Sequence, residues 1–66
     1  MTSHLNKKCT LTYKGETDIH WPSAKCVEEN NGFVKLVPFD KAKGEYDEIN
    51  FVWIDLTDKR VLISWR

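Results

Sequence analysis

The first pattern along the chain is a strict alternation of polar and apolar residues over residues 8–14. Successive side chains of a strand point to opposite faces, so Cys9, Leu11 and Tyr13 share one apolar face. This alternation predicts a half-buried strand, and residues 17–21 are expected to form its hairpin partner.

Gly15 and Pro22 are expected to delimit that hairpin. Glycine tolerates positive φ in a tight turn, whereas proline donates no ladder hydrogen bond and interrupts a strand. After Pro22, residues 24–32 (AKCVEENNG) permit two interpretations. Proline suits the first turn of a short helix and glycine its end, but the stretch lacks a helical apolar stripe, and Asn-Gly is a strong hairpin signal. We favour a strand at residues 25–29 that turns through Asn-Asn-Gly into a second strand.

The tail of the chain differs from an ordinary half-exposed strand, because residues 51–54 are apolar on both faces. A turn at residues 57–60 would make this tail a hairpin. One face of the hairpin is expected to contact the core, and it consists of Val52, Ile54, Leu56, Val61, Ile63 and Trp65. The opposite face carries Phe51, Trp53, Asp55, Leu62, Ser64 and Arg66.

These five to six short strands predict an all-β fold, a small antiparallel barrel that spans residues 1–66 as a single domain. Closure of the sheet removes exposed edges, and an SH3-like barrel is the most economical arrangement for so short a chain. The alternative is an α+β fold with one short helix near residues 22–31. Residues 1–6 are expected to be flexible.

Residues 13–19 (YKGETDI), followed by a hairpin, resemble the opening of the small archaeal chromatin proteins. Those proteins use an SH3-like barrel, so the resemblance implies the same fold. They are strongly basic, whereas this chain has a formal net charge of zero, and the resemblance therefore bears on the fold only.

The balance of ten basic and ten acidic residues argues against a nucleic-acid binder. Such proteins normally carry a basic excess, because neutralising phosphates supplies most of their affinity. The first residues contain no apolar signal region, and no apolar run approaches the roughly 20 residues that span a bilayer. With only two cysteines and no disulfide framework, the expected compartment is the cytoplasm.

Signatures of catalysis and of metal binding are missing from the sequence. It has no glycine-rich phosphate loop and no G-x-S-x-G element, so we expect neither enzymatic activity nor a cofactor. His4, Cys9, His20 and Cys26 are zinc-ligand types, but their spacing matches no familiar zinc motif, and no metal site is predicted. Both cysteines are expected to be reduced, with Cys9 in the core.

The second apolar face of the tail has to be shielded from water, and a binding partner would provide that shielding. Protein interfaces favour Trp, Phe and Arg at their centres and charged residues at their rims. We therefore expect a non-enzymatic module that binds a protein partner or a second copy of itself, such as an accessory or inhibitory protein of phage or mobile-element type. The expected partner-binding residues are Phe51, Trp53, Leu62, Arg66 and Trp21. The alternative is a small nucleic-acid-binding barrel, in which Lys35 and Arg66 contact phosphates and Trp21, Phe51 and Trp53 stack on bases.

Overall fold

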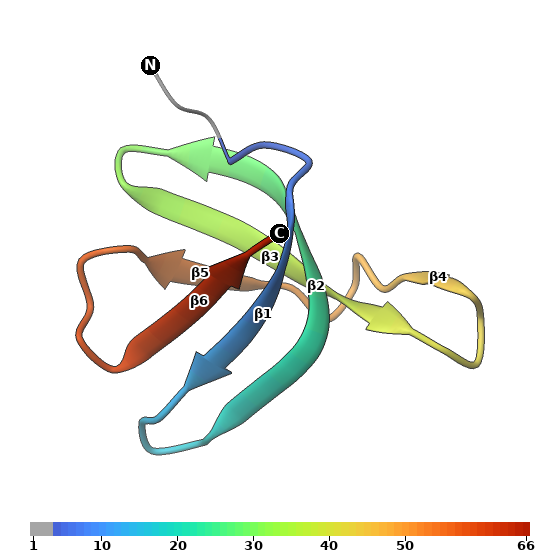
Figure 1. Ribbon diagram of the computed structural model, residues 1–66, viewed down its shortest axis with the longest axis horizontal. Helices are drawn as coiled ribbons and strands as arrows, with labels where there is room; N and C mark the ends of the chain where they lie inside the picture. Colours follow the sequence, from blue (N-terminus) through green and yellow to red (C-terminus); the bar gives the residue numbers. More distant parts are fainter. Residues whose placement is uncertain (1–3) are drawn as a thin grey trace.

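The computed structural model describes residues 4–66 (Figure 1). In that range every regular element is a strand and every ladder is antiparallel, so the predicted all-β fold is confirmed. The strands are β1 (Lys8–Tyr13), β2 (Ile19–Asn30), β3 (Phe33–Asp40), β4 (Glu45–Tyr46), β5 (Val52–Asp55) and β6 (Val61–Trp65). Among the described residues no helix is long and apolar enough to span a membrane.

The sheet is a meander whose last strand returns to the first. β3 pairs with β2, β2 with β1, and β1 with β6, while β5 and the short β4 occupy successive parts of the second edge of β3. Within residues 4–66 no ladder joins β5 to β6. The sheet is strongly curved (Figure 1), as expected for a small barrel, but no hydrogen-bonded ladder closes it between these two strands.

The hairpin predicted for the tail is wrong, because β5 pairs with β3 and β6 pairs with β1. The physical reason lies in the connection at residues 56–60. Asp55 Oδ1 accepts a hydrogen bond from Thr57 N–H (2.9 Å), and Asp58 Oδ1 accepts one from Arg60 N–H (2.9 Å). Two successive side-chain-capped turns lead the chain from one part of the sheet to another, instead of reversing it onto β5.

β2 is one long strand with two bulges, where the sequence predicted an interruption. It has one residue more than β1 around Pro22, and one more than β3 at Val27. A bulge accommodates a residue that cannot donate to the ladder, and it bends the strand. β2 therefore curves across both halves of the sheet (Figure 1), and the alternative of a helix near residues 22–31 is wrong.

The hairpin between β2 and β3 confirms the Asn-Gly prediction. Asn31 and Gly32 form its two-residue loop with φ values of 49° and 85°, a combination typical of a type I′ turn. Gly15 differs from expectation, because its φ is not positive. A Cβ at Gly15 would lie 2.5 Å from Cε1 of Tyr13, so glycine at this position leaves room for the Tyr13 ring.

The core lies on the inner face of the curved sheet. It consists of Cys9, Leu11, Ala24, Cys26, Val34, Leu36 and Ile54, all buried. Around it pack Ile19, Trp21, Val52, Val61, Ile63 and Trp65. The predicted core face of the tail is thus confirmed except at Leu56, which is 39% exposed. Leu56 lies one residue beyond the end of β5, where the inner face no longer has a strand opposite it.

The flexible segment predicted for residues 1–6 begins with residues 1–3, which lie outside the described residues. Residues 4–6 lie against β2. Asn6 N–H donates to the Cys26 carbonyl (2.7 Å), and Cys26 N–H donates to the Lys7 carbonyl (3.0 Å). These bonds continue the pairing of β1 with β2 beyond the start of β1.

Candidate functional site

The outer side of β3 and β5 carries four residues that we call the aromatic face: Phe33, Lys35, Phe51 and Trp53. Each of its three aromatic residues is 44% exposed. The register explains their position. Val34 and Ile54 oppose each other and are buried, so alternation turns the neighbouring residues of both strands outward. Lys35 then lies directly opposite Trp53.

Two contacts organise the aromatic face. Lys35 Nζ lies 4.2 Å from the ring centroid of Phe51, a distance at which a cation is attracted to an aromatic ring. Phe33 and Trp53 border a hollow of about 410 Å³ together with Asn30 and Asn31. The hollow is therefore lined by two aromatic and two amide residues.

The outer side of β3 is packed at its other end. Val37 is fully buried although it does not belong to the main core cluster. Phe39 and Tyr46 pack edge-to-face with centroids 5.1 Å apart, and Lys25 Nζ lies 4.9 Å from the Tyr46 centroid. Phe39 itself remains 37% exposed, so this end of the outer side is packed only in part.

Charges of both signs surround the aromatic face. Glu28 on β2 opposes Lys35, and Asp55 on β5 opposes Phe33. Nearby, Arg60 binds Asp58 through two nitrogens, with Nη2 2.9 Å from Oδ2 and Nε 3.1 Å from Oδ1. Hydrogen bonds from Arg60 lower the pKa of Asp58 below its usual value of 3.8. The rim is therefore electrostatically mixed rather than basic.

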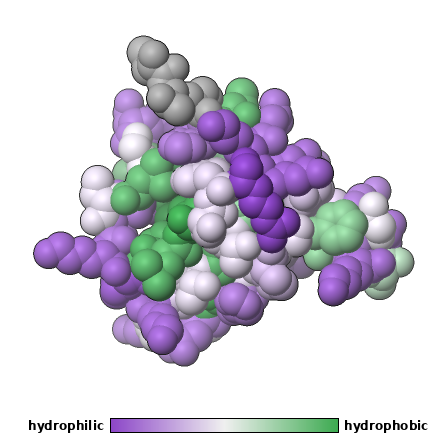
Figure 2. All heavy atoms as spheres, viewed as in Figure 1, coloured by the Kyte–Doolittle hydropathy of each residue, from purple (hydrophilic) through white to green (hydrophobic). Residues whose placement is uncertain are grey.

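Three of the five residues predicted from the sequence to bind a partner lie away from the aromatic face, namely Leu62, Trp21 and Arg66. Leu62 is 67% exposed on the outer side of β6, where it opposes Thr12 of β1. Hydrophobic atoms gather around β6 on the side of the molecule that Figure 2 shows. Trp21 opposes the fully buried Leu11 and packs against the core, so its ring contributes to the fold instead of to an outer surface.

Arg66 has a structural position at the end of β6. Its Nη2 donates to Thr10 Oγ1 (3.0 Å) and to the Pro22 carbonyl. Pro22 lies in a bulge of β2, so the guanidinium ties β6 and β1 to the bend of β2. The structure therefore brings Phe51 and Trp53 together and places Arg66, Leu62 and Trp21 elsewhere.

Phe33 was not predicted as a site residue, although the sequence holds a signal for it. Val34 and Leu36 alternate with Lys35, so a buried Val34 requires Phe33 to point outward. The first residue of a strand is easily assigned to the core when it is aromatic. Its position beside Trp53 depends on the pairing of β3 with β5, which alternation alone does not give.

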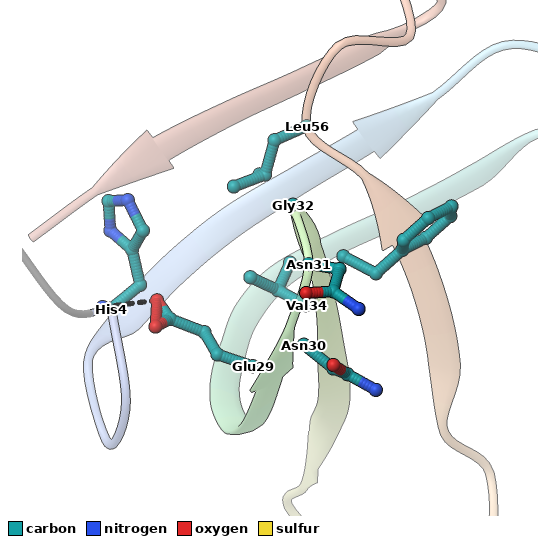
Figure 3. A pocket seen from close by; sticks show the side chains of 8 residues that line it. His4, Glu29, Asn30, Asn31, Gly32, Val34 and Leu56 are labelled. Carbon is teal, nitrogen blue, oxygen red and sulfur yellow. Dashed lines mark hydrogen bonds between the residues drawn. The ribbon is translucent and has the colours of Figure 1, made fainter.

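A separate hollow of about 330 Å³ lies where the N-terminal residues meet the β2–β3 turn (Figure 3). His4 and Glu29 border one side of it, with Asn31 and Leu56 across from them. The His4 ring stacks on Trp65 with centroids 4.2 Å apart, and its buried Nδ1 has no hydrogen-bond partner among the described residues.

Both cysteines are free thiols in the core. Burial is the main cause that raises the pKa of Cys9 from 9.0 to about 11, and it also raises the pKa of Cys26. The Cys26 thiol donates to the Glu28 carbonyl (3.3 Å). Because the thiolate is the reactive form, neither side chain is poised for nucleophilic chemistry. Residues 4–66 contain no group of His, Cys, Asp and Glu arranged to hold a metal ion.

Comparison of the chain with models of protein families, with curated proteins and with solved structures gives no match.

Proposed function

We propose that this protein is a non-enzymatic binding module that recognises a protein partner through the aromatic face. The observation that carries the proposal is the exposure of three neighbouring aromatic residues, each 44% exposed, on the outer side of β3 and β5. Exposed large aromatic residues that cluster on rigid strands are typical of the centre of a protein interface.

The charges around the aromatic face support a protein partner over a nucleic acid. An aromatic surface that stacks on bases needs cations nearby to neutralise phosphates. Here Glu28 opposes Lys35, the Lys35 ammonium lies over Phe51, and Asp55 opposes Phe33. A rim of mixed sign around an aromatic centre matches the usual composition of protein interfaces.

The test compares two exposed hydrophobic residues on different outer surfaces. A partner is first captured from source cells and purified, and its affinity for the chain is then measured by calorimetry. We expect Trp53→Ala to weaken binding by about 2 kcal/mol, because it removes the central ring of the interface. The control, Leu62→Ala, removes an even more exposed side chain on β6 and should leave the affinity unchanged.

Two results would overturn the proposal. One is a partner that binds Trp53→Ala and wild type equally while Leu62→Ala fails to bind. The other is binding of single-stranded or duplex oligonucleotides with an affinity that falls steeply as salt rises, which would assign the aromatic face to nucleic acid.

A further inference from the structure

β5 exposes an edge whose free backbone groups can be identified. Leu56 N–H donates to the Gly32 carbonyl (3.1 Å), and the register continues with Val34 opposite Ile54. Bonded and non-bonded pairs alternate in an antiparallel ladder, so Ile54 directs its N–H and C=O toward β3. Trp53 therefore directs its N–H and C=O away from β3. Within the described residues no second strand pairs with β5, so these two groups lie at the open edge of the sheet.

The edge of β5 lacks three of the features that usually prevent another strand from pairing, although it is short and ends in the charged Asp55. Natural edge strands are protected by lysine, proline or a bulge, and the four residues of β5 (VWID) include none of these. A hollow of about 240 Å³ lies at the edge. Its lining includes apolar and aromatic residues of β5, β1 and β6 and two acidic residues, namely Val52, Trp53, Ile54, Tyr13, Val61, Asp55 and Asp58. The hollow leaves space for the side chains of an added strand.

We infer that an extended segment of the partner adds to the free edge of β5 as an antiparallel strand. This inference rests on the proposed function and specifies how the aromatic face binds. The Trp53 backbone would supply a donor and an acceptor to the incoming strand. Alternate side chains of that strand would contact the Trp53 ring on the outside and Val52 and Ile54 on the inside.

The size of the aromatic face favours a single strand over a globular partner or a second copy of the chain. Its three aromatic residues are each 44% exposed, so together they offer roughly 250–300 Å² of surface. A stable interface between globular proteins buries about 800 Å² per partner. Asp55 opposes Phe33 at the end of β5, while the Lys35 ammonium lies over Phe51 at its start. An antiparallel strand that is basic at its N-terminal end and uncharged along its middle would match these charges.

β6 has an equally open edge but a poorer surface. Its outward residues Leu62 and Ser64 oppose Thr12 and Thr10 of β1, so no aromatic cluster accompanies the edge. The hollow beside the β5 edge reaches β6 only at its first residue, Val61. Strand addition is therefore assigned to β5.

The test separates backbone pairing from side-chain contact with two substitutions at one position. Trp53→Ala and Trp53→Pro both remove the indole, but only the proline also removes the free N–H. That N–H is not used in the ladder with β3, so both variants should fold, which far-UV circular dichroism would check. We expect Trp53→Pro to bind an extended peptide about tenfold more weakly than Trp53→Ala does.

The probe is an acetylated and amidated heptapeptide of alternating threonine and valine that begins with lysine, titrated into labelled protein and followed by NMR. Binding of the heptapeptide should slow hydrogen exchange at the Trp53 amide. N-methylation of alternate peptide residues blocks one hydrogen-bonding edge of the peptide and should therefore abolish binding. The inference is overturned if the heptapeptide does not bind, if the methylated peptide binds equally well, or if the two Trp53 variants bind it alike. Loss of partner binding in Trp53→Ala combined with equal binding by the two variants would leave the proposed function standing without strand addition.

Discussion

At the scale of single residues, Trp53 and Trp65 show how one side-chain type occupies two different environments. Trp53 is 44% exposed on an outer face, whereas Trp65 packs against the core and stacks on His4. We expect Trp65→Ala to lower the free energy of unfolding by about 3 kcal/mol, because it leaves a cavity beside the core. Trp53→Ala should change it by less than about 1 kcal/mol. Urea unfolding of both variants checks this, and equal losses would contradict the assignment.

The raised pKa of the Cys9 thiol predicts how the stability of the fold changes at alkaline pH. Burial raises its folded-state pKa from 9.0 to about 11, so the folded state retains the proton over a range in which the unfolded state loses it. The stabilisation from this thiol is therefore complete below pH 9 and is lost as pH rises toward 11. We expect the difference in melting temperature between wild type and Cys9→Ala to shrink across that interval. A constant difference would show that the thiol does not titrate with a raised pKa.

At the scale of elements, the β2–β3 turn depends on backbone conformation alone. Gly32 has φ of 85°, and a Cβ there would meet no heavy atom within 4 Å. Gly32→Ala should therefore destabilise the fold by about 1–2 kcal/mol through φ strain and not through a clash. Chemical synthesis with D-alanine at this position supplies the control, since the D-residue prefers positive φ and should restore stability. Equal midpoints of unfolding for the L- and D-alanine proteins would refute this account.

Alternation along the sequence predicted which residues of each strand face the core, but it could not predict which strands pair. Ile54 and Ile63 were placed on one inner face, as the structure has them, because period-two patterning is a property of each strand. Their assumed hairpin failed because Asp55 and Asp58 cap turns that redirect the chain. The strand interruption predicted at Pro22 was wrong for a related reason, since a bulge in β2 removes the conflict between proline and the hydrogen-bonded ladder.

At the scale of the whole molecule, the candidate site was predicted only in part. Alternation along residues 51–54 predicted Phe51 and Trp53 on one outer face. In the structure Phe51 lies one residue before β5, Trp53 lies within it, and both are exposed. Leu62 and Arg66 were assigned to the site because of the assumed hairpin. The pairing of β6 with β1 places both of them elsewhere on the molecule. Phe33 belongs to the site because β3 pairs with β5. Which residues share a surface is decided by long-range pairing, and a single sequence carries little information about that.

The pairing of β1 with β6 also determines how the molecule responds to mechanical tension. Arg66 N–H donates to the Lys8 carbonyl (3.0 Å) at one end of this ladder, and Lys14 N–H donates to the Arg60 carbonyl (3.1 Å) at the other. Tension applied through the two chain ends loads this ladder from the end at Lys8 and Arg66, so that its pairs separate one after another. Tension between Lys14 and Arg66 would instead shear all the ladder bonds at once. In a force spectrometer the protein should therefore yield at a lower force when it is pulled by its ends, so its strength has a direction.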